Sequence, residues 1–310
     1  MKLFTFQTKD GHDRIGTFWS ENVVLDIVNA GERLPNSKFE TVKDMKGFIE
    51  IGDIAIKKLQ QMIKELKDLE AKDQEIFNGI RSSSFYHVKD IKFQAPISNP
   101  QKIICLGRNF LDHAKEGGAA VPKNPMIWGK FNSAIIGHQD KIVIPKISEK
   151  PDVEIEFVVI IGKKGKHIPE DKALEYVFGY TIGNDVTARD YQYDDKQFTR
   201  AKTMDTFAPM GPWIVLPDEI PNPQELELEL KVNGNIWQKS NTKHMIFSVA
   251  YTISYLSKSF TFEPGDIIFT GTPSGVGHYQ KPPQYLKEGD IVSLEIEKVG
   301  TLVNPVVKEK

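Results

Sequence analysis

The sequence predicts a mixed α/β fold that is dominated by β-strands. Residues 225–232 alternate strictly between charged and apolar side chains and end at Asn233-Gly234, a strong signal for a hairpin turn. Residues 157–161 form an uninterrupted apolar run of strand length. Helical periodicity is confined to a few segments, of which residues 56–69 are one. Together these patterns indicate a strand-rich molecule with few helices.

The N-terminal part predicts a small α+β domain. Short strand-like pieces, separated by turn residues as in a meander, occur at residues 3–6, 15–19 and 23–27. The amphipathic pattern of residues 56–69 then adds a helix. A polar tract and two prolines follow it and suggest a boundary near residues 95–100. We therefore predict a small domain over residues 1–95 and a larger domain over residues 96–310.

The larger domain contains mainly strand signals. Turns at residues 262–266 and 287–290 lead into apolar strands at residues 267–270 and 291–296. Helices are expected near residues 170–178, where Pro169-Glu170-Asp171 suits a first helical turn, and over residues 246–258. We therefore expect a β-dominated domain with peripheral helices.

Bulk properties narrow the function classes. A net charge of −2 gives no electrostatic case for binding nucleic acid or an anionic membrane. No segment reaches the roughly 18 apolar residues of a membrane helix, and residues 1–7 lack the apolar core of a signal peptide. The single cysteine, Cys105, lies in an apolar run and is interpreted as a buried hydrophobic residue. These features favour a cytoplasmic protein with reduced thiols.

Two acidic residues open the apolar run of residues 157–161. Because side chains alternate along a strand, Glu154 and Glu156 point to the same side, roughly 7 Å apart. Two like charges at the edge of a core repel each other and are costly to desolvate. A divalent cation such as Mg²⁺, Mn²⁺ or Ca²⁺ relieves both problems. The alternative is an edge strand whose acidic face is merely solvated.

Asp185 supplies a third carboxylate, because it follows the predicted strand at residues 179–182. Three carboxylates leave about three open positions on an octahedral Mg²⁺ or Mn²⁺ ion, enough for a bidentate substrate and one water. We interpret the neighbouring Arg189 and Asp190 as a structural salt bridge, and Asp194-Asp195 as a solvated acidic face.

Several separated blocks resemble the fumarylacetoacetate hydrolase family, and they follow the family's order and spacing over roughly residues 95–305. The blocks are Gly107–Glu116, Glu154-Ile155-Glu156, Asn184–Asp190, Lys202–Trp213 and Thr270–Gly277. The resemblance implies a β-roll catalytic fold, usually dimeric, and an enzyme of this family. It also implies a divalent metal, Mg²⁺ or Mn²⁺, held by Glu154, Glu156 and Asp185.

The same resemblance implies the substrate contacts. Lys202 is expected to be catalytic and to face the metal-bound substrate together with Gln192, and Thr272 is expected near the substrate carboxylate. Lys130 matches another active-site lysine, although Phe131-Asn132 replaces the more usual small or proline residues after it. Arg108, at the start of the first block, is added as a predicted substrate contact.

His113 and Glu116 are predicted to form a catalytic pair. At spacing i, i+3 they share one face of a short helix, so the carboxylate can orient the imidazole as a general base for water. The alternative is a surface pair without function. In hydrolases that this chain resembles, a matching pair lies on a segment that orders over the substrate, and Gly117-Gly118 offers a hinge.

These residues predict metal-dependent C–C bond cleavage of a small 2-oxo acid through a metal-bound pyruvate enolate. Water attack on a C4 carbonyl gives acylpyruvate hydrolysis, whereas loss of CO₂ gives oxaloacetate decarboxylation, and the loops resemble a bacterial branch with such decarboxylases. The alternatives are a 2-oxo sugar acid dehydratase, a diene-acid isomerase, or a weakly catalytic metabolite sensor. The expected partners are the substrate and a second copy of the chain, without nucleic acid or membrane.

Overall fold

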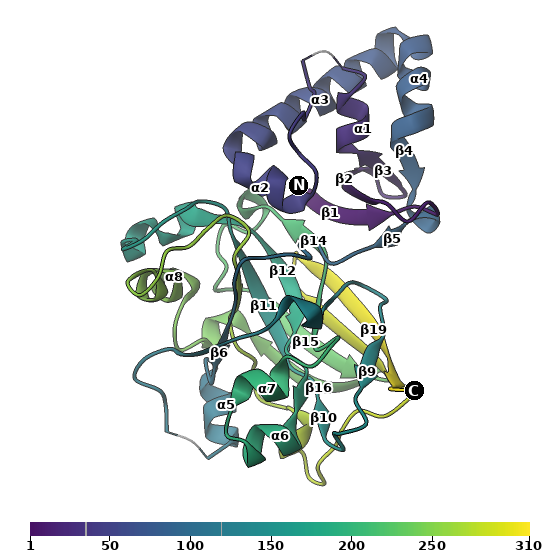
Figure 1. Ribbon diagram of the computed structural model, residues 1–310. Helices are drawn as coiled ribbons and strands as arrows, with labels where there is room; N and C mark the ends of the chain where they lie inside the picture. Colours follow the sequence, from purple (N-terminus) through teal and green to yellow (C-terminus); the bar gives the residue numbers. More distant parts are fainter. Residues whose placement is uncertain (35, 119) are drawn as a thin grey trace.

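The computed structural model describes residues 1–34, 36–118 and 120–310 (Figure 1). It is a mixed α/β structure rich in strands, as predicted. The N-terminal elements are β1 (Lys2–Gln7), β2 (Asp13–Ser20), β3 (Val23–Asp26), α1 (Ile27–Gly31), α2 (Met45–Ile51), α3 (Asp53–Lys72), α4 (Gln74–Ser84), β4 (Phe85–His87) and β5 (Lys92–Phe93). They contain the predicted meander, and α3 extends the predicted helix at both ends.

The larger part follows with short strands and short helices. Up to residue 202 its elements are β6 (Ile103–Gly107), α5 (Leu111–Glu116), β7 (Met126–Gly129), β8 (Ile135–Ile136), β9 (Ile142–Ile144), β10 (Pro151–Asp152), β11 (Ile155–Ile161), β12 (Val177–Asn184), β13 (Thr187–Ala188), α6 (Arg189–Asp194) and α7 (Phe198–Lys202). The remaining elements are β14 (Ala208–Val215), β15 (Glu227–Val232), β16 (Asn235–Asn241), α8 (Val249–Ser257), β17 (Ile267–Phe269), β18 (Ile291–Ile296) and β19 (Gly300–Lys308). Six short 3₁₀ turns complete the described residues, at Val88–Asp90, Asn132–Ala134, Glu170–Tyr176, Pro217–Glu219, Thr242–His244 and Gly277–Tyr279.

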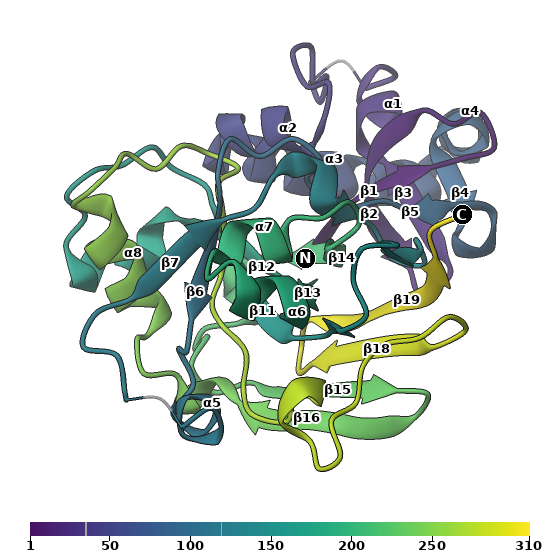
Figure 2. The ribbon, with the colours of Figure 1, turned by 60° about the horizontal axis from the view of Figure 1, so that its bottom comes forward.

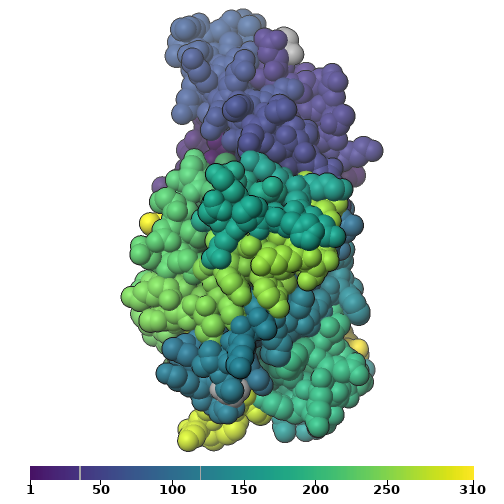
Figure 3. Space-filling view, turned by 90° about the vertical axis from the view of Figure 1, so that its left-hand side faces the viewer, coloured from purple at the N-terminus to yellow at the C-terminus, as the bar shows by residue number. Residues whose placement is uncertain are grey.

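One large sheet runs through both parts of the chain, in the order β4-β3-β2-β1-β14-β12-β11-β17-β6-β7. Strand β1 joins them, because Lys2 and Leu3 pair with Val215 and Ile214 of β14. The N-terminal elements nevertheless form a lobe of their own above the rest (Figures 1 and 3). The boundary near residues 95–100 stays a prediction, since the two parts also share apolar core contacts.

A second sheet has the order β16-β15-β18-β19-β9 (Figure 2). Strand β11 has a core on each face, because Phe157, Val159 and Ile161 pack in one apolar cluster. Val158 and Ile160 point to the other face and pack in a second cluster. Burial on both faces explains why this strand is apolar at every position after Glu156. The alternative of a solvated acidic edge is therefore wrong, since β11 lies between β12 and β17.

Local chemistry explains the elements near the site. Asn233 and Gly234 both have positive φ, 51° and 80°, as a tight primed turn requires, and they join β15 to β16. Helix α8 begins where the Ser248 side chain accepts a hydrogen bond from the Tyr251 amide, three residues later than predicted. The predicted helix at residues 170–178 is a 3₁₀ helix that ends at Tyr176. Among the described residues, no helix has the length and apolar character needed to cross a membrane.

Candidate active site

The three predicted metal ligands converge at the end of two neighbouring strands. Glu154 and Glu156 flank the first residue of β11, and Asp185 directly follows β12, whose Asn184 pairs with Ile155. One carboxylate oxygen from each acid lies within 4.8 Å of the others. All three side chains are buried. The strand ladder therefore fixes three acids in one small volume.

The chemistry of this cluster fits a hard divalent cation. The Oε2 atom of Glu156 accepts a hydrogen bond from the Gly271 amide at 2.7 Å, but its buried Oε1 atom has no partner among the described residues. Burial and the carboxylates of Asp185 and Glu154 raise the pKa of Glu156 well above its usual range. A cation satisfies the free oxygen and offsets the repulsion, and all-oxygen ligands suit Mg²⁺, Mn²⁺ or Ca²⁺.

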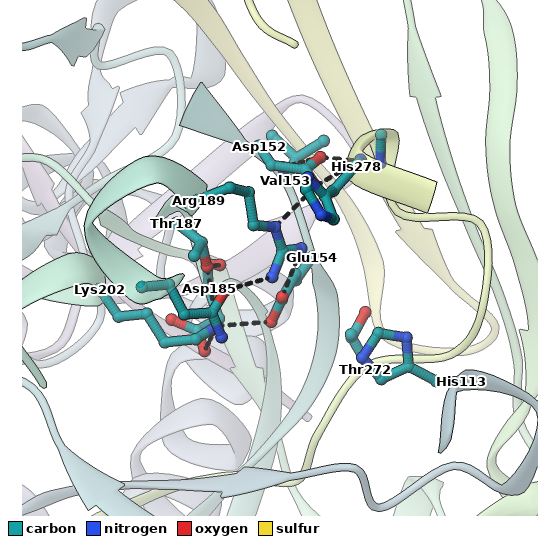
Figure 4. A network of polar contacts seen from close by, with 12 residues as sticks. His113, Asp152, Val153, Glu154, Asp185, Thr187, Arg189, Lys202, Thr272 and His278 are labelled. Atoms are coloured by element: carbon teal, nitrogen blue, oxygen red, sulfur yellow. Dashed lines mark hydrogen bonds and ion pairs between the residues drawn. The ribbon is translucent and has the colours of Figure 1, made fainter. Parts of the chain in front are cut away.

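Two buried lysines contact the same acids. The Nζ atom of Lys202 donates to Glu154 at 2.8 Å, to Asp185 at 2.7 Å and to Thr187 at 2.7 Å (Figure 4). Burial lowers the pKa of Lys202, but the carboxylates outweigh this and raise it, so the side chain is charged. The Nζ atom of Lys130 donates to Asp185. Both lysines therefore lie beside the acidic cluster, and their roles toward a substrate stay a prediction.

Arg189 belongs to this network, which corrects its predicted role. It does not pair with Asp190 but contacts Asp152 at 2.9 Å and Glu154 at 2.7 Å, and it donates to Gln192 at 2.9 Å. Asp190 instead accepts hydrogen bonds from the Ser148 side chain and the Glu149 amide. The prediction paired Arg189 with Asp190 because they are adjacent in the sequence. In the structure the two side chains contact different residues.

Asp152 was not predicted as a site residue, yet its carboxylate is the anchor of Arg189. It is wholly buried and accepts hydrogen bonds from Arg189 Nε and from the amides of Val153, Gly277 and His278, all at 2.8–2.9 Å (Figure 4). A Cβ atom at position 277 would clash with the Gln284 carbonyl oxygen and lie 2.8 Å from Asp152 Oδ1, so this close approach requires glycine. The available signal was its place one step before Glu154 in the same alternating acidic run.

The predicted pair of His113 and Glu116 is formed on α5. Nδ1 of His113 lies 3.2 Å from Glu116 Oε2, and the other oxygen of Glu116 accepts the Gly275 amide at 2.9 Å. Ser274 also donates to Asp112 at 2.7 Å. These bonds tie the short helix to the turn at residues 274–275. His113 faces the space beside Thr272, across from Glu154 (Figure 4).

A cavity of about 260 Å³ joins these groups. Its lining contains the predicted residues Arg108, His113, Glu154, Gln192, Lys202 and Thr272. It also contains residues that were not predicted, which are Leu106, Gly107, Met126, Trp128, Arg189, Tyr193, Lys196, Phe198 and Tyr279. The other predicted site residues lie outside the lining, and they are Glu116, Lys130, Glu156 and Asp185. The cavity therefore has a charged inner end, an apolar wall and a mouth built from short helices.

Cys105 lies in the centre of β6 and is wholly buried, as predicted. Burial and the nearby Asp185 raise the pKa of its thiol well above the usual range. A neutral, enclosed thiol is a packing group rather than a nucleophile. Asp194 is exposed and Asp195 pairs with Arg200, in line with the predicted solvated face.

Comparison with known proteins identifies the family. Residues 102–307 match the family model described as fumarylacetoacetate (FAA) hydrolase C-terminal. The chain belongs to the fumarylacetoacetate hydrolase family. It is 41% identical to a fumarylacetoacetate hydrolase domain-containing protein 2 homolog of Dictyostelium discoideum, over 99% of this chain and 97% of that protein. It is 40% identical to oxaloacetate tautomerase fahd2, mitochondrial, of Xenopus laevis, over 99% and 90% of the two chains.

Solved structures of the family share the fold. A fumarylacetoacetate hydrolase from Exiguobacterium antarcticum superposes with a TM-score of 0.79 at 33% identity and full coverage of both chains. A 5-carboxymethyl-2-hydroxymuconate delta-isomerase from Mycobacterium smegmatis gives a TM-score of 0.73 at 30% identity, again over both full chains. These relatives are named as enzymes that act on small organic acids, and this chain is an enzyme of the same family.

Proposed function

We propose that this enzyme moves a proton on a small 2-oxo acid, with keto–enol tautomerisation of oxaloacetate as its main reaction. The observation that carries the proposal is a cavity with an oriented imidazole, His113, on one wall and the charged groups of Glu154 and Lys202 on the other. The name oxaloacetate tautomerase, which relatives from Xenopus laevis and Homo sapiens bear, supports the choice of substrate.

Glu154, Glu156 and Asp185 would hold the divalent cation, for which Mg²⁺ and Mn²⁺ are the simplest candidates. When bound, such a cation supplies a Lewis acid that stabilises negative charge on the 2-oxo acid oxygens. Four buried carboxylates here face three buried cations, namely Asp152, Glu154, Glu156 and Asp185 against Lys130, Arg189 and Lys202. With all four carboxylates ionised around it, a divalent ion would give this region a net positive charge, which favours an anionic substrate.

His113 is the proposed base. Its Nδ1 atom faces Glu116, which leaves Nε2 to accept the proton from C3 of the substrate while the electrons of that C–H bond move toward the C2 oxygen. The carboxylate of Glu116 stabilises the imidazolium that forms. The ammonium of Lys202 stabilises the charge that develops on oxygen. Protonation of that oxygen from solvent gives the enol while His113 releases its proton to solvent, and the reverse sequence restores the ketone.

A second candidate is hydrolytic C–C cleavage of an acylpyruvate, which uses the same imidazole to activate water. The apolar wall formed by Met126, Trp128 and Phe198 favours it, because this wall offers room for an acyl group. Water would add to the C4 carbonyl, and cleavage of the C3–C4 bond would give pyruvate and a carboxylic acid. Decarboxylation of oxaloacetate would also give pyruvate, but without a water nucleophile.

One panel of assays separates these reactions. The purified protein is mixed with oxaloacetate or acetylpyruvate, with Mg²⁺, with Mn²⁺ or after chelation, and both enol absorbance and pyruvate release are followed. Tautomerase activity speeds the relaxation of enol absorbance without releasing pyruvate. Pyruvate from oxaloacetate identifies a decarboxylase, and pyruvate from acetylpyruvate identifies a hydrolase. Unchanged relaxation of oxaloacetate with either metal contradicts the main proposal.

The His113→Gln variant tests the base. We expect a rate loss of roughly 10²-fold or more in tautomerisation, the usual contribution of a positioned general base. His244→Gln is the matched control, since His244 is exposed and does not line the cavity. A loss of similar size in both variants contradicts the assignment of His113 as the base.

The homodimer that the family resemblance implies also stays a proposal. Light scattering on the purified protein tests it.

A further inference from the structure

Two cations in the cavity lining have no ion-pair partner among the residues that the structure describes. The lining carries four permanently charged cations and one carboxylate. Arg189 and Lys202 are paired with buried acids. Arg108 and Lys196 are exposed at the mouth, and within residues 1–34, 36–118 and 120–310 neither forms an ion pair or a side-chain hydrogen bond. The lining at the mouth therefore carries two cations that form no ion pair with the described residues.

The backbone at both positions is unusual. Arg108 and Lys196 have φ angles of 54° and 53°, a region that residues with a Cβ atom disfavour. Of the non-glycine residues with positive φ among those described, these two line the cavity. Strained backbone that survives folding is held by its surroundings and clusters at functional sites.

The residue after Arg108 fixes the backbone of this turn. Asn109 is wholly buried, and its side-chain amide donates to the carbonyls of Phe247 and Thr270 at 3.1 and 2.7 Å. Its side-chain oxygen accepts the Phe247 amide at 2.8 Å. The strained turn after β6 is thus fixed on its buried side, and the exposed Arg108 lines the cavity.

We propose that Arg108 and Lys196 bind the second carboxylate of a 2-oxo dicarboxylate, and so select diacids over monoacids. The inference rests on the proposed function, in which the keto oxygen lies near Lys202, and on the expected position of the first carboxylate near Thr272. An exposed lysine or arginine ordinarily only improves solubility. Arg108 and Lys196 line the same small cavity, so both attract a dianion that enters it. The planar guanidinium of Arg108 suits bidentate binding of a carboxylate.

The apolar residues of the lining strengthen this selection. Met126, Trp128 and Phe198 lie in the same cavity as the two cations. Apolar walls lower the local dielectric constant, so the attraction between a bound carboxylate and the cations exceeds that of a fully solvated pair. A volume of about 260 Å³ suits a short diacid rather than a large ligand.

Binding of malate and of lactate tests the subsite without turnover. Both are 2-hydroxy acids that do not enolise, and only malate has a second carboxylate. Isothermal titration in the presence of Mn²⁺ is performed on the wild type, Arg108→Gln, Lys196→Gln and the control Lys123→Gln, which removes an exposed charge outside the lining. We expect the wild type and control to bind malate about tenfold more tightly than lactate. Each cavity variant should lose most of that preference while its affinity for lactate is unchanged.

Kinetics provide the second readout. The value of kcat/KM for oxaloacetate should fall roughly tenfold in each cavity variant, whereas that for acetylpyruvate, whose distal group is neutral, should change less than about twofold. Equal losses for both substrates, an unchanged malate preference, or no binding of malate by the wild type overturns the subsite. If the wild type prefers malate and the variants do not, but oxaloacetate is not tautomerised, the proposed function fails and the subsite stands.

Discussion

The inner end of the cavity and its mouth are built on different principles. At the inner end Glu154, Glu156 and Asp185 sit at the ends of central strands and are buried. At the mouth Arg108 and Lys196 lie on exposed turns beside short helices. Strand ladders fix the inner groups by many backbone bonds, whereas the mouth depends on a few side-chain contacts. This difference is consistent with the two proposals made above, in which the inner end holds the cation and the mouth selects the substrate.

The largest effect is expected at the inner end. Asp185→Asn keeps the size of the side chain but removes one of three charges that would hold the cation. We expect loss of Mn²⁺ binding by titration calorimetry and a fall in kcat of about 10³-fold or more. Thorough chelation of the wild type should have a similar effect.

The control for this prediction is Asp190→Asn. Asp190 lies on the same segment, but among the described residues its carboxylate accepts hydrogen bonds only from Ser148, Glu149 and its own helix. The Asp190→Asn variant should retain its Mn²⁺ affinity and most of the wild-type activity. If Asp185→Asn binds Mn²⁺ as well as Asp190→Asn does, the inner end is a structural acidic cluster. The proposed contrast between a cation-binding inner end and a substrate-selecting mouth is then contradicted.

An intermediate effect is expected at Asp152, which links the two regions. Its carboxylate holds Arg189, which contacts Glu154, and it also holds the amides before Tyr279, which lines the mouth. Asp152→Asn leaves a donor facing a donor, so we expect a loss of about 3 kcal/mol in the free energy of unfolding, measured by urea denaturation. Mn²⁺ affinity should fall about 10-fold or more, because Arg189, which contacts the proposed metal ligand Glu154, loses its partner.

Asp266→Asn separates positioning from stability. Asp266 is also wholly buried, pairs with Lys102 at 2.8 Å and accepts the Glu263 amide, but it does not touch the cavity. We expect a comparable loss of stability in this variant with unchanged Mn²⁺ affinity. Equal loss of affinity in both variants shows that Asp152 acts only on the fold.

The smallest effect is expected from a histidine near the mouth. Burial and the nearby Arg189 lower the pKa of His278 below 6.5. The unfolded chain then binds more protons than the folded one, so this residue makes the protein less stable as the pH falls through the region of 6.5. His278→Gln should therefore show a smaller fall in Tm between pH 7.5 and pH 5.5 than the wild type. An identical fall in Tm shows that His278 is protonated equally in both states.

Much of the inner end could be predicted from the sequence. Glu154 and Glu156 are related by strand alternation, and the apolar run after them indicates burial. His113 and Glu116 are related by helix spacing, and the structure forms this pair. In each case the signal lies within a few residues of chain. Lys130 and Lys202 have no such local signal, and their placement came from the resemblance.

The groups that sequence reasoning missed depend on contacts between distant segments. Asp152 meets the amides of residues 277 and 278, and no periodicity connects these positions. Arg189 was assigned to its neighbour because adjacency is visible in a sequence and a fold is not. Tyr193 and Tyr279 touch through their hydroxyl groups at 2.9 Å, although 86 positions separate them. Short helices and turns at the mouth carry weak patterns, so this region was the least predictable.

The burial of Cys105 allows selective labelling of a cysteine introduced elsewhere, because the native thiol does not react in the folded protein. Because the single sulfhydryl is neutral and enclosed in β6, alkylating reagents reach it only when the chain opens. Its modification rate therefore reports unfolding without any engineered probe. A cysteine placed at an exposed position outside the lining, as in Lys123→Cys, would react alone in the folded enzyme. A fluorophore attached there leaves both cations of the mouth in place while the native thiol stays unlabelled.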